Sequence, residues 1–118
     1  MVLQGHDHCV SRTFPVNDKL NFQTEENFQT VEGVEYSANP QDTIYLMNGP
    51  AGDQTGDGKM IAGANDPKKY KYASGSVVRS YAEIQVSDNT VTVTVKYVND
   101  SGSVKTNYHK WGIIKTAA

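Results

Sequence analysis

Two histidines near the N-terminus are the residues of this chain whose type and spacing are best suited to chemistry. His6 and His8 flank Asp7 in the run Gln4–Cys9. In an extended backbone, side chains two positions apart leave the same face about 7 Å from each other. Imidazole is the commonest metal ligand in proteins, and paired metal ions in hydrolases lie about 3.5–4 Å apart. The spacing therefore predicts that both histidines are metal ligands, with Asp7 on the opposite side.

A less specific reading is that the two histidines are exposed loop residues or the remnant of an expression tag. A tag does not explain the flanking residues, Val2-Leu3-Gln4-Gly5 before the pair and Ser11-Arg12-Thr13 after it. Cys9, beside the pair, is the only cysteine, so the chain forms no internal disulfide and no cysteine-based zinc site. We interpret Cys9 as a small packed side chain.

The histidine run resembles the Gly-His-x-His signature of the calcineurin-like metallophosphoesterases. With Ser11-Arg12-Thr13-Phe14-Pro15 behind it, the segment is similar to the purple acid phosphatase-like branch of that family. Residues 42–52, 80–86 and 111–115 also look like later strands and a small-residue loop of this branch. The resemblance spans nearly the whole chain, but its only chemically specific part is the histidine motif.

This resemblance implies hydrolysis of a phosphate ester by a hydroxide bound to two divalent or trivalent metal ions, which would be Fe, Mn or Zn. His6 would bind one ion and His8 the other. Arg12 would either contact the substrate phosphate or brace the loop through a carboxylate such as that of Asp7. A secreted or cell-surface location is also implied.

The other ligand motifs of the family, Asp-x-His, Gly-Asp-x-x-Asp and Gly-Asn-His-Asp/Glu, are absent from the sequence. We therefore expect a C-terminal segment of a metallophosphoesterase of α/β/β/α fold, inactive alone. Its partner would be the missing N-terminal half of the catalytic domain. Exposed strand edges would otherwise favour self-association. A β-sandwich binding or accessory module, with incidental histidines, is the alternative from another functional class.

The pattern of the chain predicts a mainly β fold, in which antiparallel strands or a meander form part of a β-sandwich. Val91, Val93 and Val95 alternate with threonines, which is typical of a strand with one buried face. Further strands are expected at 30–36, 42–47, 81–86 and 105–115. The predicted single domain, 1–118, divides into a metal-ligand loop at 1–16, a long loop at 49–73 and a β-meander at 77–115.

The charge and apolar content of the chain exclude two classes of binding partner. A formal net charge of −2 gives no basic surface for nucleic acid. No run approaches the roughly 18 apolar residues of a membrane-spanning helix, so we expect no membrane partner.

Three further signals have ordinary explanations. The run Asp53–Gly58 opens like an EF-hand loop, but Ala64 stands where the closing carboxylate belongs, so a solvated turn is favoured. Asn99-Asp100-Ser101 is a glycosylation sequon that also suits a hairpin turn, and we favour the turn. His109 lies within the predicted last strand, where we expect a structural role.

Overall fold

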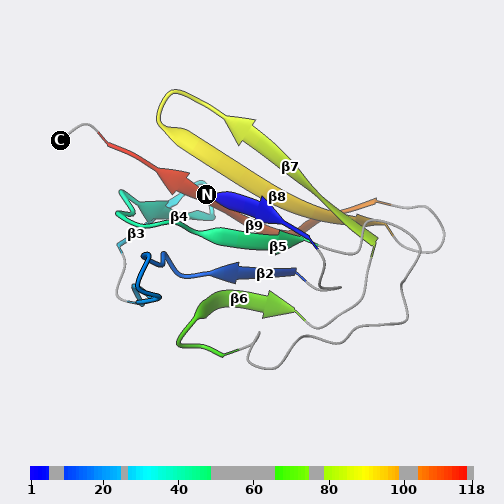
Figure 1. Ribbon diagram of the computed structural model, residues 1–118. Helices are drawn as coiled ribbons and strands as arrows, with labels where there is room; N and C mark the ends of the chain where they lie inside the picture. Colours follow the sequence, from blue (N-terminus) through cyan, green and yellow to red (C-terminus); the bar gives the residue numbers. More distant parts are fainter. Residues whose placement is uncertain (6–9, 25–26, 49–65, 75–78, 99–103, 117–118) are drawn as a thin grey trace.

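The computed structural model describes residues 1–5, 10–24, 27–48, 66–74, 79–98 and 104–116 (Figure 1). These residues form nine strands in two sheets that pack face to face. The prediction of a mainly β, sandwich-like fold is confirmed. No helix occurs in this part of the chain, and thus none that is long and apolar enough to cross a membrane.

The smaller sheet has four strands, in the order β1-β5-β2-β6. Their bounds are Val2–Gln4 for β1, Tyr45–Asn48 for β5, Val10–Thr13 for β2 and Tyr70–Ser74 for β6. β1 runs parallel to β5, whereas β2 is antiparallel to both β5 and β6. β1 and β6 are the outer strands of this sheet.

The larger sheet has five strands, in the order β3-β4-β9-β8-β7. Their bounds are Phe28–Val31 for β3, Val34–Ala38 for β4, Val104–Ile114 for β9, Thr90–Val98 for β8 and Arg79–Val86 for β7. Strands β7, β8 and β9 form the expected antiparallel meander. β4 joins β9 in parallel, so β9 links the meander to the β3–β4 hairpin.

The core lies between the sheets. Val93 and Val95 of β8 are fully buried, as their alternation with threonines predicts, and they pack beside Trp111 of β9. The same cluster receives three side chains from the other half of the sandwich: Val10, Ile44 and Leu46. Burial of these apolar side chains, about 1.5–3 kcal/mol for each, is the main term that holds the sheets together.

A glycine on β9 makes room for a tyrosine on β4. Tyr36 and Gly112 are paired residues, and so are Gly112 and Thr92 of β8. The Tyr36 ring lies over Gly112, where a Cβ would be 2.5 Å from two ring carbons, and the hydroxyl groups of Tyr36 and Thr92 are hydrogen-bonded at 2.9 Å. The ring thus covers the outer face of three strands and buries Thr92.

The ends of β4 and β9 are tied by one residue. Asn39 has a left-handed backbone, with φ of 50°, and its N–H donates to the carbonyl of Ile114. Its side-chain amide donates to Oγ1 of Thr116 and accepts from the backbone N–H of Thr116, both at 3.0 Å. Asparagine tolerates this backbone conformation better than most residues, so it suits the position.

The two long sides of the sandwich differ. On one side, Lys71 of β6 pairs with Glu35 of β4 at 3.4 Å and lies 4.3 Å from the ring centre of Phe28 on β3. On the other side the edge strands are β1 and β7, and the core-facing Leu3 of β1 remains 51% exposed. The sandwich is therefore closed along one side and open along the other.

Several expectations are wrong in detail. Residues 70–73, expected in the long loop 49–73, belong to β6; residues 49–65 lie outside the described part of the chain. The expected strand at 30–36 is a hairpin, because Glu32 and Gly33 both have positive φ and turn the chain between β3 and β4. The segment 1–16 contains β1 and β2 as well as a loop. Two of the strand pairs are parallel, where we expected antiparallel strands.

Candidate functional site

The predicted ligands fall in the sequence between β1 and β2, and these two strands lie beside β5 in the smaller sheet. β1 and β2 flank β5 on either side, with Gln4 paired to Met47 and Val10 paired to Asn48. Because β1 and β5 are parallel, their carboxyl ends lie side by side at one end of the sheet. We call this end the carboxyl edge. His6 and His8 lie outside the described residues; in the sequence they fall between β1 and β2.

Asn48 places an oxygen acceptor at the same edge. Its side-chain Oδ1 is buried and has no hydrogen-bond partner in the structure. An unsatisfied buried acceptor costs about 1–3 kcal/mol, so such groups call for an explanation. The expected strand at 42–47 ended one residue before Asn48, and this oxygen was not predicted. Its position at the end of a strand was the available signal.

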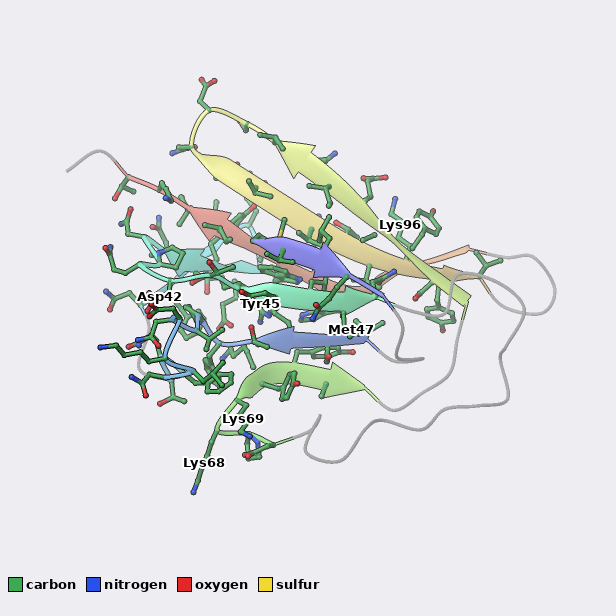
Figure 2. All side chains as sticks on the ribbon, in the orientation of Figure 1. Asp42, Tyr45, Met47, Lys68, Lys69 and Lys96 are labelled. Carbon is green, nitrogen blue, oxygen red and sulfur yellow. The ribbon has the colours of Figure 1, made fainter. Side chains whose placement is uncertain are left out.

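An apolar groove opens next to this edge, along the open side of the sandwich. Its volume is about 360 Å³. Leu3 and Leu46 line it from the smaller sheet, and Ala82 and Ile84 of β7 line it from the larger one; Gln4, Gly5 and Asn48 complete it. On the opposite face of β5, Tyr45 and Met47 point away from the core (Figure 2). The edge is thus bordered by apolar surface on both faces of the sheet.

Arg12 lies inside the sandwich. Its side chain is 4% exposed, and its guanidinium carbon lies 4.5 Å from the ring centre of Trp111 on β9. A desolvated cation over an indole ring is worth about 2 kcal/mol. This contact joins β2 to the larger sheet and differs from both expected roles, contact with the substrate phosphate and bracing through a carboxylate. Asp7, the carboxylate considered for it, lies outside the described residues.

His109 lies beside Arg12 in the same interior. Its ring stacks on Tyr72 of β6, with the ring centres 3.7 Å apart and the planes 6° from parallel. Burial, and to a lesser degree the positive charge of Arg12, lowers the pKa of His109 to about 3. Its Nε2 is buried without a hydrogen-bond partner. The imidazole is therefore neutral near pH 7.

The remaining predicted sites lie outside the described residues. No group of three or more His, Cys, Asp or Glu side chains is arranged to hold a metal ion within the ranges that the structure describes. Cys9, the run Asp53–Gly58 with Ala64, and the sequon at Asn99 lie outside those ranges.

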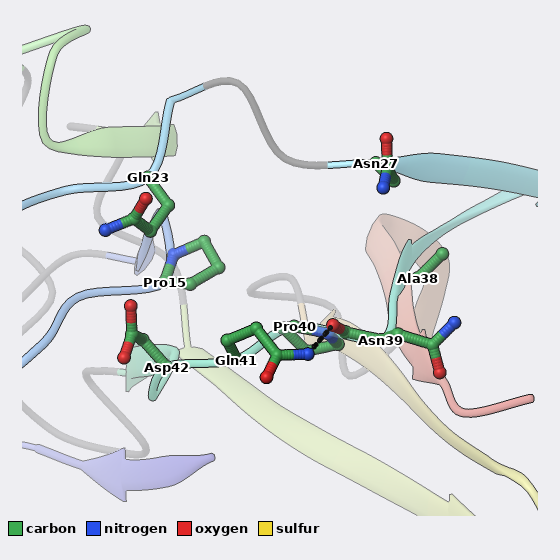
Figure 3. Close-up of a pocket in the computed structure, with 8 residues that line it drawn as sticks. All are labelled: Pro15, Gln23, Asn27, Ala38, Asn39, Pro40, Gln41 and Asp42. Carbon is green, nitrogen blue, oxygen red and sulfur yellow. Dashed lines mark hydrogen bonds between the residues drawn. The ribbon is translucent and has the colours of Figure 1, made fainter. Parts of the chain in front are cut away.

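A second hollow lies at the far end of the molecule, between the residues that precede β3 and the connection from β4 to β5. It has a volume of about 220 Å³. Figure 3 shows Gln23 and Asp42 on either side of Pro15, while the side-chain amide of Gln41 donates to the carbonyl of Asn39 at 3.1 Å. Its remaining lining residues are Asn27, Ala38 and Pro40. Amides, a carboxylate and proline rings make this a polar, shallow site.

Comparison with known proteins adds no relative. No family model matches the chain, and no curated protein or solved structure is significantly similar to it.

Proposed function

We propose that this chain is the C-terminal segment of a dinuclear metal-dependent phosphoesterase, and that His6 and His8 are two of its metal ligands. The observation that carries the proposal is the Gly5-His6-Asp7-His8 motif, between two strands that flank the carboxyl end of β5. In open α/β sheets ligands bind beyond the carboxyl ends of parallel strands, and β1 and β5 are the parallel pair of this mixed sheet.

The roles of the side chains follow from their chemistry. Neutral imidazoles of His6 and His8 would hold the two ions, which would be Fe, Mn or Zn. When bound, such ions supply a water of lowered pKa that attacks a phosphate ester. A metal-bound histidine usually donates its other N–H to an acceptor, and the unsatisfied Oδ1 of Asn48 is an acceptor of this type.

Arg12 is assigned here to bracing. Its guanidinium, held over Trp111, keeps β2 on the larger sheet and so fixes one end of the histidine segment. The alternative role, contact with the substrate phosphate, would require the guanidinium to face a site outside the core.

A complete site needs ligands beyond the histidine pair, and the edge strand β1 supports their coming from another segment. Val2 and Leu3 point to opposite faces of the sheet and are 39% and 51% exposed. A strand with apolar residues on both faces is typical of a position covered on both sides. We therefore propose the N-terminal half of a catalytic domain as the partner along β1. Association of two copies of this chain through the unpaired side of β1 is the competing possibility.

A non-catalytic binding module remains the second candidate. The hollow of Figure 3 favours it, because amide side chains and Asp42 surround it without any contribution from the histidine segment. Ligand binding there, with no metal binding at His6 and His8, would support the module.

Backbone NMR with added Mn²⁺ tests the metal proposal. The paramagnetic ion broadens nearby amide signals even when binding is weak, which suits two imidazoles without carboxylates. We expect broadening of Gly5, Val10 and Asn48 in the wild-type chain and none in the variant His6→Ala/His8→Ala. Broadening that persists in the variant would overturn the assignment of the ligands, as would no localised broadening in the wild type.

Hydrolysis of p-nitrophenyl phosphate tests the segment proposal with the same two proteins. We expect no turnover by the chain alone with manganese, zinc or iron. Turnover that disappears in the variant would instead show that this chain forms a working site by itself, which contradicts its assignment as an incomplete segment.

A further inference from the structure

Four side chains form a polar and aromatic layer between the two sheets. Arg12 and Tyr72 are paired residues on β2 and β6, and they lie side by side on the inner face of the smaller sheet. His109 and Trp111 are two apart on β9 and share the inner face of the larger sheet. Arg12 lies over Trp111, and Tyr72 stacks on His109. We call these four residues the inter-sheet layer.

The layer accommodates His109 only in its neutral form. The buried Nε2 has no hydrogen-bond partner, and because both ring nitrogens of an imidazolium carry N–H, the protonated ring would bury a charged donor without an acceptor. It would also place a second positive charge near the guanidinium of Arg12, inside a low-dielectric interior. Separation of the sheets would return the imidazolium to water and remove both penalties.

We propose that the inter-sheet layer is an acid-sensitive latch, which holds the two sheets together while His109 is neutral and releases them when His109 is protonated. This inference goes beyond the proposed function and does not depend on metal binding by His6 or His8. The described groups around His109 are Tyr72 from β6, Arg12 from β2 and its strand partner Val95 from β8. Of these, only the imidazole of His109 belongs to a class of side chain whose ordinary pKa lies in the mildly acidic range. His109 is therefore the group whose charge changes.

The direction of the pH effect follows from linkage. The pKa of His109 is about 3 in the closed form and near its ordinary value of 6.5 once exposed, so opening takes up a proton between these values. The opening equilibrium constant therefore rises as the pH falls below about 6.5, and it levels off near pH 3. Between about pH 7 and pH 5 the expected increase is about 25-fold.

The single tryptophan of the chain reports on this layer directly, because Trp111 is fully buried within it. We propose urea titrations followed by Trp111 emission at about pH 7 and pH 5. The proteins are the wild type, His109→Phe, which keeps an aromatic ring against Tyr72, and His6→Ala/His8→Ala, a control that removes the other two histidines.

For the wild type and the His6→Ala/His8→Ala control, we expect the opening constant to rise by about 25-fold more than in His109→Phe between the two pH values. An equal pH response in the wild type and His109→Phe would overturn the proposal. So would quenching of Trp111 at pH 5 without a red shift or a lower urea midpoint.

If His109→Phe does not fold, a pH titration of the wild type tests the latch instead. The carbon-bound ring protons of His109, followed by NMR, should keep their neutral-form shifts down to the pH at which Trp111 becomes exposed. Titration of this ring near pH 6.5 in the folded protein would overturn the latch.

Discussion

The substitution Gly112→Ala is the most direct test of how the larger sheet is packed. A Cβ at this position would lie 2.5 Å from Cδ1 and Cε1 of Tyr36 and 2.6 Å from the carbonyl oxygen of Val91. The Tyr36 ring can move aside, but the Val91 oxygen belongs to the backbone of the neighbouring strand, β8. The added methyl therefore displaces the ring and also strains the ladder between β8 and β9.

Three contributions set the change that Gly112→Ala causes in the free energy of unfolding. Overpacking of a closely packed site costs about 1–3 kcal/mol. Displacement of Tyr36 also weakens its hydrogen bond to Thr92, which is worth about 1 kcal/mol. The reduced freedom of the unfolded chain, when glycine becomes alanine, offsets about 0.4–1 kcal/mol. We expect the free energy of unfolding to fall by about 1–3.5 kcal/mol.

Urea unfolding followed by Trp111 emission measures this loss. Adding Gly112→Ala to a Tyr36→Ala background should cost at least about 1 kcal/mol less than adding it to the wild type, because the ring is gone and only the Val91 contact remains. Gly33→Asn is a control for backbone strain without a steric clash: φ at Gly33 is 78°, which L side chains rarely adopt, and nothing lies within 4 Å of a Cβ there, so we expect a loss of at most about 1 kcal/mol. A loss below about 0.5 kcal/mol for Gly112→Ala would refute the packing argument.

Three smaller effects are expected in the same urea assay. Glu32→Asn should raise the free energy of unfolding by about 0.5–1 kcal/mol, because the two-residue turn with Gly33 requires positive φ, and no gain would contradict this. Leu20→Asn should also stabilise, by about 0.5 kcal/mol, since Leu20 has φ of 60° and is 75% exposed; a loss would reveal a contact that the leucine makes. Tyr36→Phe should cost about 1 kcal/mol through its lost bond to Thr92, and a neutral result would show that this bond adds nothing.

The C-terminal meander could be predicted because its information is local. Val91, Val93 and Val95 alternate with threonines, and the polar residues 87–89 and 99–102 mark where the strands end. Alternation with a short break specifies a hairpin without reference to the rest of the chain. Val93 and Val95 are in the core as predicted, but the expectation of a single buried face is wrong for β8, because Thr92 and Thr94 on its other face are also buried.

Other elements depend on distant partners and were not predictable in the same way. β6 contains Lys71 and two tyrosines, a weak pattern, and it is a strand because β2 pairs with it and because Tyr72 stacks on His109. The pairing of β1 with β5 is likewise set by tertiary context. In the candidate site, residue type alone could single out the histidines, but it gave no sign that Arg12 would be buried against an indole ring.

The clasp between Asn39 and Thr116 has a consequence for the order of folding. Its two partners are 77 residues apart in the sequence, and β9 follows every other described strand. The β3–β4 hairpin can form early from local contacts, but it joins the larger sheet only through β9. Closing so long a loop is slow, so we expect refolding on the order of milliseconds to seconds, limited by the docking of β9. Until then the hairpin's inner edge stays unpaired and open to association with other chains.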